Sequence, residues 1–265
     1  MRKIALGIFA HPDDAEFMCT GTLSLLKKAG WSIHIASMAK GDKGTNKLSR
    51  AEISRVRKAE AEKSAALLDA KFHCLEFDDV YIFYDRDTVN RTTGLLRQIR
   101  PDVVFTSSTN DYMADHEITS MIVQTACFST GIKNLEIDEE PYEPMPYLYY
   151  CDPMEGKDVL GNLVQPSIYV DITSEMAIKE KMLSCHASQR NWLLEHHQVD
   201  GYTNFMKHMA QMRGKEAKSA FAEGFRQHLG HGYPQHNLLR EILGDLVISK
   251  NTAQIPVPDD IFKEN

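Results

Sequence analysis

The sequence predicts an α/β protein with a Rossmann-like, doubly wound and mostly parallel sheet, helices on both faces and an α-rich C-terminal extension. Two observations support this fold class. Continuous apolar runs such as KIALGIFA (3–10) are typical of strands that are buried on both faces of a parallel sheet. In the first half of the chain such runs alternate with segments of helical periodicity, and this alternation requires right-handed crossovers between parallel strands.

The first half contains four expected strands, each followed by an expected helix. The strands are 3–10, 32–39, 71–77 and 102–108, and the helices are 21–30, 49–70, 86–101 and 116–130. Local signals indicate where the helices begin and end. Gly30 ends the first helix, Ser49 and Glu52 form a capping box at the start of the second, and Pro101 closes the third.

The second half is less regular, but strands and long helices are still expected. YLYYC (147–151) and SIYVDI (167–172) have strand patterns. One long helix is expected over 173–197, with its cap at Thr173 or Ser174. More helix is expected around 203–222, and the charged segment 213–228 is interpreted as an amphipathic packing helix. We expect one domain over 1–250 and an extended tail over 251–265.

Composition limits the possible partners and the location. The chain has 265 residues and a net charge of −7, which argues against a general nucleic-acid binder. Its five cysteines are scattered and form no C-x-x-C pair, which argues against a disulfide framework and against a thiolate zinc site. No apolar run approaches the roughly 18 residues of a membrane span, and the first residues lack a signal-peptide pattern. We therefore expect a cytoplasmic protein that binds a small molecule, not nucleic acid or a membrane.

Two polar clusters follow strands of the predicted sheet. His11-Pro12-Asp13-Asp14 comes directly after the first strand, and the segment 110–116 follows the strand at 102–108. Ligands of open parallel sheets bind beyond the carboxyl ends of the strands, so the two clusters meet if both strands are central. His11, Asp14 and His116 would then form a His₂-carboxylate set with an open fourth position, which is typical of catalytic zinc. Asp13 points away from Asp14 and is free to act as a general base.

Structural interpretations of the same residues stay open. The His-Pro-Asp-Asp segment is also compatible with a turn in which an aspartate caps the next helix, and Asp115 alone would be a good cap for 116–130. The joint occurrence of both clusters at strand ends favours a metal site. Imidazole and carboxylate ligands accept Zn²⁺, and also Fe²⁺ or Co²⁺.

The motif AHPDD, followed by Glu16 and Gly21-Thr22-Leu23, resembles the LmbE-like (PIG-L-type) zinc N-deacetylases. Further similarities are Arg57-x-x-Glu60, Asp115-His116, His186-x-Ser188-Gln189 and AEGF (222–225), the last similar to the branch that acts in bacillithiol synthesis. The resemblance implies an enzyme that uses zinc-activated water to remove acetyl from an N-acetylglucosamine-type conjugate. It also implies zinc ligands at His11, Asp14 and His116, the catalytic base at Asp13, and a symmetric homo-oligomer.

The sequence departs from this family at Met113, where the family commonly has a histidine that stabilises the oxyanion or protonates the leaving amine. A thioether can do neither, because it has no proton and no charge. His186 is a candidate catalytic substitute, or else a helix residue that forms hydrogen bonds near the site. Candidate substrate-binding residues are Arg57, Asn110, Asp111 and Tyr112, and each is also compatible with a structural role. The loop GDKGTN (41–46) is interpreted either as part of the pocket rim or as a solvated turn.

Two other functions are compatible with the same residues. The enzyme could deacylate a non-sugar amide, or the chain could be a catalytically weak, metal-bearing binding module. Met113 motivates the binding module, whereas Asp13 argues against it, because a module that only binds metal needs no base.

Overall fold

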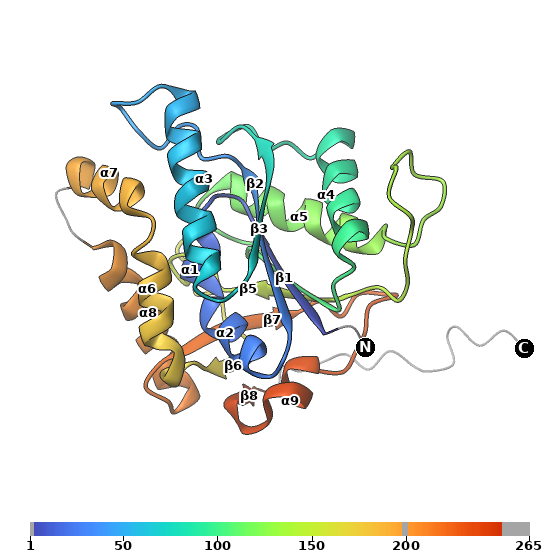
Figure 1. Cartoon of the computed structure of the whole chain (residues 1–265). Helices are drawn as coiled ribbons and strands as arrows, with labels where there is room; N and C mark the ends of the chain where they lie inside the picture. Colours follow the sequence, from blue (N-terminus) through green and yellow to red (C-terminus); the bar gives the residue numbers. More distant parts are fainter. Residues whose placement is uncertain (1–2, 198–200, 251–265) are drawn as a thin grey trace, which may run out of the picture.

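The computed structural model describes residues 3–197 and 201–250, and a single mixed sheet runs through this part of the chain (Figure 1). The sheet has eight strands in the order β3-β2-β1-β4-β5-β7-β6-β8. The first five are parallel and are β3 (Lys71–Phe77), β2 (Ser32–Ala39), β1 (Ile4–Phe9), β4 (Val103–Thr106) and β5 (Tyr147–Cys151). The last three pair antiparallel and are β7 (Ala222–Gln227), β6 (Ile168–Asp171) and β8 (Val247–Ser249).

Helices cover both faces of the sheet. One face carries α4 (Arg86–Ile99) and α5 (Ala114–Phe128). The other carries α1 (Asp14–Met18), α2 (Thr20–Lys28), α3 (Arg50–Ala66), α6 (Met176–Leu183), α8 (Tyr202–Ala217) and α9 (Leu238–Leu243). Alternate residues of β1 fill the two cores: Ala5 and Phe9 belong to one, and Leu6 and Ile8 to the other. The predicted Rossmann-like α/β class is confirmed.

The order of the strands creates the position of the functional site. β1 lies between β2 and β4, and Gly7 is in register with Ile35 on one side and Phe105 on the other. The chain therefore winds in opposite directions from β1, and the carboxyl ends of β1 and β4 border the crevice where ligands bind in such sheets. The polar clusters after these two strands thus lie at one edge.

Several predicted element ends are confirmed. The Ser49 hydroxyl accepts a hydrogen bond from the Glu52 N–H, and Glu52 reaches back to Ser49, so the capping box of α3 is formed. The strands predicted over 32–39, 71–77 and 147–151 have the predicted bounds.

The single helix expected over 173–197 is wrong. Residues 173–175 form a short 3-10 helix, α6 ends at Leu183, and a separate helix, α7, spans Ala187–His197. The turn between them carries His186, whose ring is fully buried against Glu16. The polar residues before His186 are compatible with a helix, so the periodicity did not indicate this break.

The helix expected around 203–222 and the amphipathic helix over 213–228 are also wrong beyond Ala217. Lys218 ends α8 with a left-handed backbone (φ 60°), and 222–227 is the strand β7. Glu223 explains the error, because this charged residue is buried. Its carboxylate accepts hydrogen bonds from the N–H groups of Gly21 and Thr22 and from the Lys179 ammonium. The segment 251–265, expected to be an extended tail, lies outside the described residues.

Among the described residues, no helix combines the length and the apolar character needed to cross a membrane.

Candidate active site

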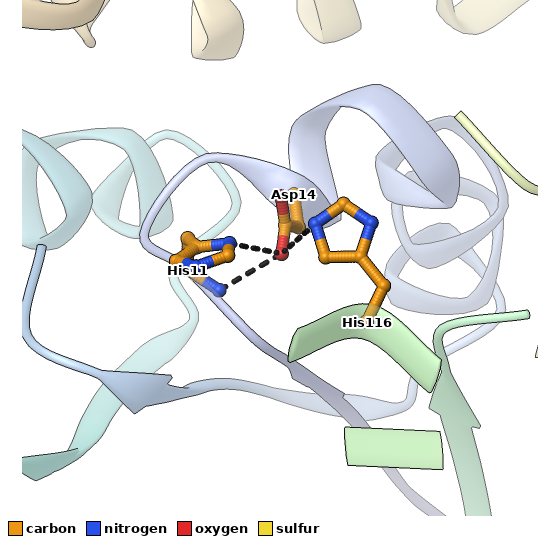
Figure 2. Close-up of side chains that lie close together, drawn as sticks. All are labelled: His11, Asp14 and His116. Carbon is orange, nitrogen blue, oxygen red and sulfur yellow. Dashed lines mark hydrogen bonds and ion pairs between the residues drawn. The ribbon is translucent and has the colours of Figure 1, made fainter. Parts of the chain in front are cut away.

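The two polar clusters meet at the carboxyl edge of the sheet (Figure 2). His11 comes from the turn between β1 and α1, Asp14 is the first residue of α1, and His116 comes from the first turn of α5. Each side chain offers one ligand atom, and these three atoms lie within 4.8 Å of one another. Asp14 Oδ2 is 3.5 Å from His11 Nδ1 and 3.5 Å from His116 Nε2. The structure therefore brings together the three residues that the sequence suggested as metal ligands.

A buried carboxylate stands behind each histidine. His11 Nε2 is 3.0 Å from Asp115 Oδ2, and His116 Nδ1 is 3.2 Å from Asp111 Oδ1. Such carboxylate–histidine pairs fix the tautomer and the ring orientation of metal ligands. Each ring thus presents its other nitrogen to Asp14. The donor set fits a divalent cation such as zinc, with two imidazoles, one carboxylate and room for further ligands.

The charges of the cluster also favour a cation at this point. Burial lowers the pKa of His11, but hydrogen bonds to Asp115 and Asp14 outweigh burial and raise this pKa to about 9. Burial raises the pKa of Asp14, yet His116 and His11 hold it well below its ordinary value. Asp14 is thus an ionised carboxylate under almost complete burial, which is stable only beside positive charge.

Asp13 lies beside this cluster and is held from two directions. The Arg57 guanidinium donates to its Oδ1 at 3.1 Å, and the Tyr202 hydroxyl donates to its Oδ2 at 2.6 Å. Its backbone φ is 130°, a strained value for a residue with a side chain. Burial raises the pKa of Asp13, although the Arg57 charge opposes this shift. A fixed carboxylate with a raised pKa suits a general base.

Arg57 needs the space that Gly41 leaves. A Cβ atom on Gly41 would lie 2.5 Å from Arg57 Cδ, which leaves no space for a side chain. The φ of Gly41 is +74°, a backbone conformation that also favours glycine. Asp79 holds the same loop by accepting hydrogen bonds from the N–H groups of Gly41 and Lys43. Lys43 and Gly44 line the cavity, so the loop 41–46 forms part of its rim.

The residues of the later motifs, Glu60, His186 and Ser188, form contacts with one another and with α1 outside the cavity lining. Glu60 on α3 accepts hydrogen bonds from the Ser188 N–H and hydroxyl, at 2.9 and 2.6 Å, and so caps α7. His186 Nε2 is 3.2 Å from Glu16 Oε1, and Ser64 donates to the same oxygen. His186 does not line the cavity, but its charge acts on Asp13 and opposes the rise in the pKa of that carboxyl.

The candidate substrate-binding residues are not equivalent in the structure. Arg57 and Tyr112 line the cavity, as does Met113 at the position where a histidine is common. Asp111 is fully buried and faces His116, and its Oδ2 accepts a hydrogen bond from the Met154 N–H. Asn110 is exposed and lies outside the cavity lining.

A cavity of about 660 Å³ opens in front of the cluster. The candidate metal-ligand set, His11, Asp14 and His116, lines the cavity with Asp14 and His116 buried, whereas Val80 and Tyr112 are more than half exposed and lie at its mouth. Sequence reasoning missed Tyr202 and Asp79, which both line this cavity. Tyr202 follows Asp13 by 189 positions, and nothing in its local sequence indicates the contact.

The sheet carries two histidines and an aspartate after its strands β1 and β4, which is the arrangement that the motifs resembling PIG-L-type enzymes predicted. The family model described as PIG-L, GlcNAc-PI de-N-acetylase, matches residues 6–127. The resemblance to LmbE-like (PIG-L-type) deacetylases that the motifs indicated is confirmed.

Similar proteins have different activities in their names. A 4-oxalmesaconate hydratase of Pseudomonas putida KT2440 is 25% identical over 82% of each chain. A probable N-acetyl-α-D-glucosaminyl L-malate deacetylase of Bacillus cereus is 24% identical over 74% of this chain and 87% of its own. The solved N,N′-diacetylchitobiose deacetylase of Pyrococcus horikoshii is 27% identical, with a TM-score of 0.72 over 85% of this chain and 84% of its own.

Proposed function

We propose that the protein is a metal-dependent deacetylase that hydrolyses the acetamide of an N-acetylglucosamine-type conjugate. The observation that carries this proposal is the Asp13 carboxylate, clamped by Arg57 and Tyr202, in the same cavity as His11, Asp14 and His116. Similarity to deacetylases of amino-sugar conjugates in B. cereus and P. horikoshii supports it.

His11, Asp14 and His116 would hold the metal, with Zn²⁺ as first choice and Fe²⁺ or Co²⁺ as alternatives that the same ligands accept. When bound, such a metal lowers the pKa of water from 15.7 towards about 7 and polarises a carbonyl oxygen.

Asp13 performs the proton transfers in this proposal. It removes a proton from the attacking water as the new C–O bond forms at the acetamide carbon. It returns that proton to nitrogen as the C–N bond breaks, so the products are acetate and a free amine. Arg57 and Tyr202 hold its two oxygens in place, and Met113 contributes no proton. His186 is fully buried and paired with Glu16. We therefore assign it a positioning role, and not the role of catalytic substitute for which the sequence made it a candidate.

Hydration of an unsaturated carboxylate is a second candidate function. Met113, which cannot protonate a leaving amine, and the similarity to the P. putida hydratase favour it. The charges of the cavity oppose it. Its lining carries the carboxylates of Asp13, Asp14, Asp79 and Glu155 but only Lys43 and Arg57 as permanent cations. Both cations already face carboxylates, so a polyanionic substrate would lack further cationic partners beyond His11, His116 and a metal that they hold with Asp14.

A panel of substrates tests the two functions. Purified protein with added zinc is offered N-acetylglucosamine conjugates, simple N-acetyl amides without a sugar and an unsaturated tricarboxylate. Acetate release from the sugar conjugates supports the proposal. Release from the non-sugar amides alone would show that the enzyme deacylates an amide without a sugar. Loss of ultraviolet absorbance from the tricarboxylate would support the hydratase. Bound metal without any turnover would support the binding module.

A further inference from the structure

We propose that the mouth of the cavity is a subsite for an apolar aglycone. The preferred substrate is then an N-acetylglucosaminide whose anomeric substituent is aromatic or aliphatic, instead of a second sugar or a carboxylic acid. This inference rests on the proposed deacetylase function and specifies its substrate class.

Six side chains define this apolar subsite. They are Phe17, Val80, Tyr112, Met113, Met154 and Phe205, and all of them line the same cavity as the metal-ligand set. Val80 is 58% exposed, Tyr112 52% and Phe205 36%. Exposed apolar side chains that converge on one cavity are typical of a ligand-binding surface, because a bound apolar group removes them from water.

Three polar side chains of the cavity lining, those of Lys43, Asp79 and Gln189, are already engaged by the protein. The Lys43 ammonium binds Asp42, both oxygens of Asp79 accept backbone N–H groups, and Gln189 Nε2 donates to the Gly44 carbonyl. The hydroxyls of a second sugar would have to replace these contacts or lose their bonds to water. Buried polar groups without partners weaken binding, so the lining discriminates against a polar aglycone.

Val80 lies at the mouth of the cavity in a strained backbone conformation. Its φ is +72°, which is an outlier for a β-branched residue. The Val80 N–H donates to Asp115 Oδ2 at 2.7 Å, and the same oxygen bonds His11 Nε2. The carboxylate that orients a metal ligand therefore also holds Val80 at the mouth. Tyr81 and Phe83, 55% and 57% exposed, follow Val80 in the chain and lie outside the cavity lining.

Charge excludes an acidic aglycone. Glu155 and Asp79 lie on the cavity lining, and Lys43 is paired with Asp42. An anionic substituent such as malate would meet more negative than positive charge outside the metal-ligand set.

Matched substrates test the subsite on the full-length, zinc-loaded protein. Acetate release is measured from methyl, phenyl and octyl N-acetylglucosaminides, from diacetylchitobiose and from N-acetylglucosaminyl malate, with both anomers of each simple glycoside. We expect kcat/KM for the phenyl or octyl compound to exceed that for the methyl compound at least tenfold, mainly through a lower KM. Equal rates, or preference for chitobiose or malate, would overturn the subsite and leave the deacetylase intact. Failure of every compound to release acetate would overturn the proposed function, and the subsite with it.

Two variants test whether the preference for an apolar aglycone comes from the proposed subsite. Phe205→Ala and Val80→Asn are expected to lower the ratio of phenyl to methyl kcat/KM at least fivefold. Asparagine tolerates the left-handed backbone, so Val80→Asn should keep the wild-type Tm or raise it, which separates lost binding from misfolding. Phe128→Ala is the control, because this exposed residue on α5 lies outside the cavity lining. An unchanged ratio in both subsite variants would contradict the assignment.

Discussion

At the scale of single residues, the proposed mechanism depends on how Asp13 is held. Its two oxygens receive hydrogen bonds from Arg57 on α3 and Tyr202 on α8. Both donors stabilise the ionised carboxylate, which is the form that accepts a proton. The account therefore predicts that loss of one donor changes the pH dependence of the reaction and not only its rate.

Tyr202→Phe tests this dependence. A hydrogen bond to a charged group contributes about 1.5–3 kcal/mol, so kcat/KM should fall by up to about 100-fold. Because the hydroxyl lowers the pKa of Asp13, its removal raises that pKa, and the acid limb of the pH–kcat/KM profile should move to higher pH. Metal content should not change.

Tyr84→Phe is the matched control for that experiment, because the Tyr84 hydroxyl contacts Thr125 and the residue lies outside the cavity lining. A Tyr202→Phe profile with an unmoved acid limb would show that Tyr202 does not act on the base.

Met113→His is a second prediction at this scale. A histidine here would supply the proton donor that the thioether lacks, and one oxyanion donor typically contributes about 2.7–4 kcal/mol. We expect kcat for the methyl glycoside to rise at least tenfold, measured as acetate release at saturation. A fall in kcat with metal content unchanged would indicate that another group already performs this role.

Sequence could predict part of the site at this scale. His11, Asp14 and His116 follow strands whose carboxyl ends meet, so the sequence was enough to predict that these three side chains lie together. Tyr202 could not be predicted, because its contact depends on how α8 returns across the sheet. The buried role of Asp111 likewise depends on the orientation of His116, which a sequence pattern does not contain.

At the scale of elements, prediction succeeded where periodicity and local signals agree. The capping box of α3 and the apolar run of β2 are examples. It failed where a charged or polar residue is buried, as with Glu223 in β7 and His186 between α6 and α7. Polar residues are normally on the surface, so the pattern assigned Glu223 to an amphipathic packing helix and His186 to the middle of one long helix.

The edge pair β2–β3 carries a prediction about acid stability. His34 Nδ1 lies 2.9 Å from His73 Nε2, and the rings are stacked. Burial, with His73 and Lys71 nearby, lowers the pKa of His34 from 6.5 to about 4. Between these values the unfolded chain binds a proton that the folded chain does not, so stability falls as the pH drops from 6.5 to 4.

His34→Gln should reduce that loss by about 1 kcal/mol, a value lowered from the full shift because the half-buried ring is screened by water. Urea unfolding at pH 7 and pH 4.5 measures it. His208→Gln, on an exposed face of α8, serves as control. The same acid sensitivity in His34→Gln and wild type would exclude the pair as its origin.

At the scale of the whole molecule, the fold brings together residues from segments that are far apart in the sequence at one edge of the sheet. The strand order around β1 places the 11–14 turn beside the start of α5, and α3 and α8 complete the wall. Alternating strands and helices allowed the parallel half of the sheet to be predicted. The antiparallel half was not fully predicted, because β7 is a late segment inserted between β5 and β6.

Metal should stabilise the entire fold. A ligand that binds only the folded state at 100 times its Kd adds about 2.7 kcal/mol. For a domain of this size the increase corresponds to about 5–10 °C in Tm. We expect this rise when zinc is added to chelator-treated protein, and its loss in His116→Ala. An equal rise in His116→Ala would place the metal elsewhere.

The most direct test of the central claim measures metal content and acetate release together in wild type and in Asp13→Asn, with phenyl and methyl N-acetylglucosaminides as substrates. Asp69→Asn is the control, because this exposed carboxylate pairs with Lys27 and both residues lie outside the cavity lining. The account predicts about one metal ion per chain in all three proteins. It also predicts a loss of acetate release of about 10²–10⁴-fold in Asp13→Asn alone. Full acetate release by Asp13→Asn, or wild-type protein that binds no metal after reconstitution, would contradict it.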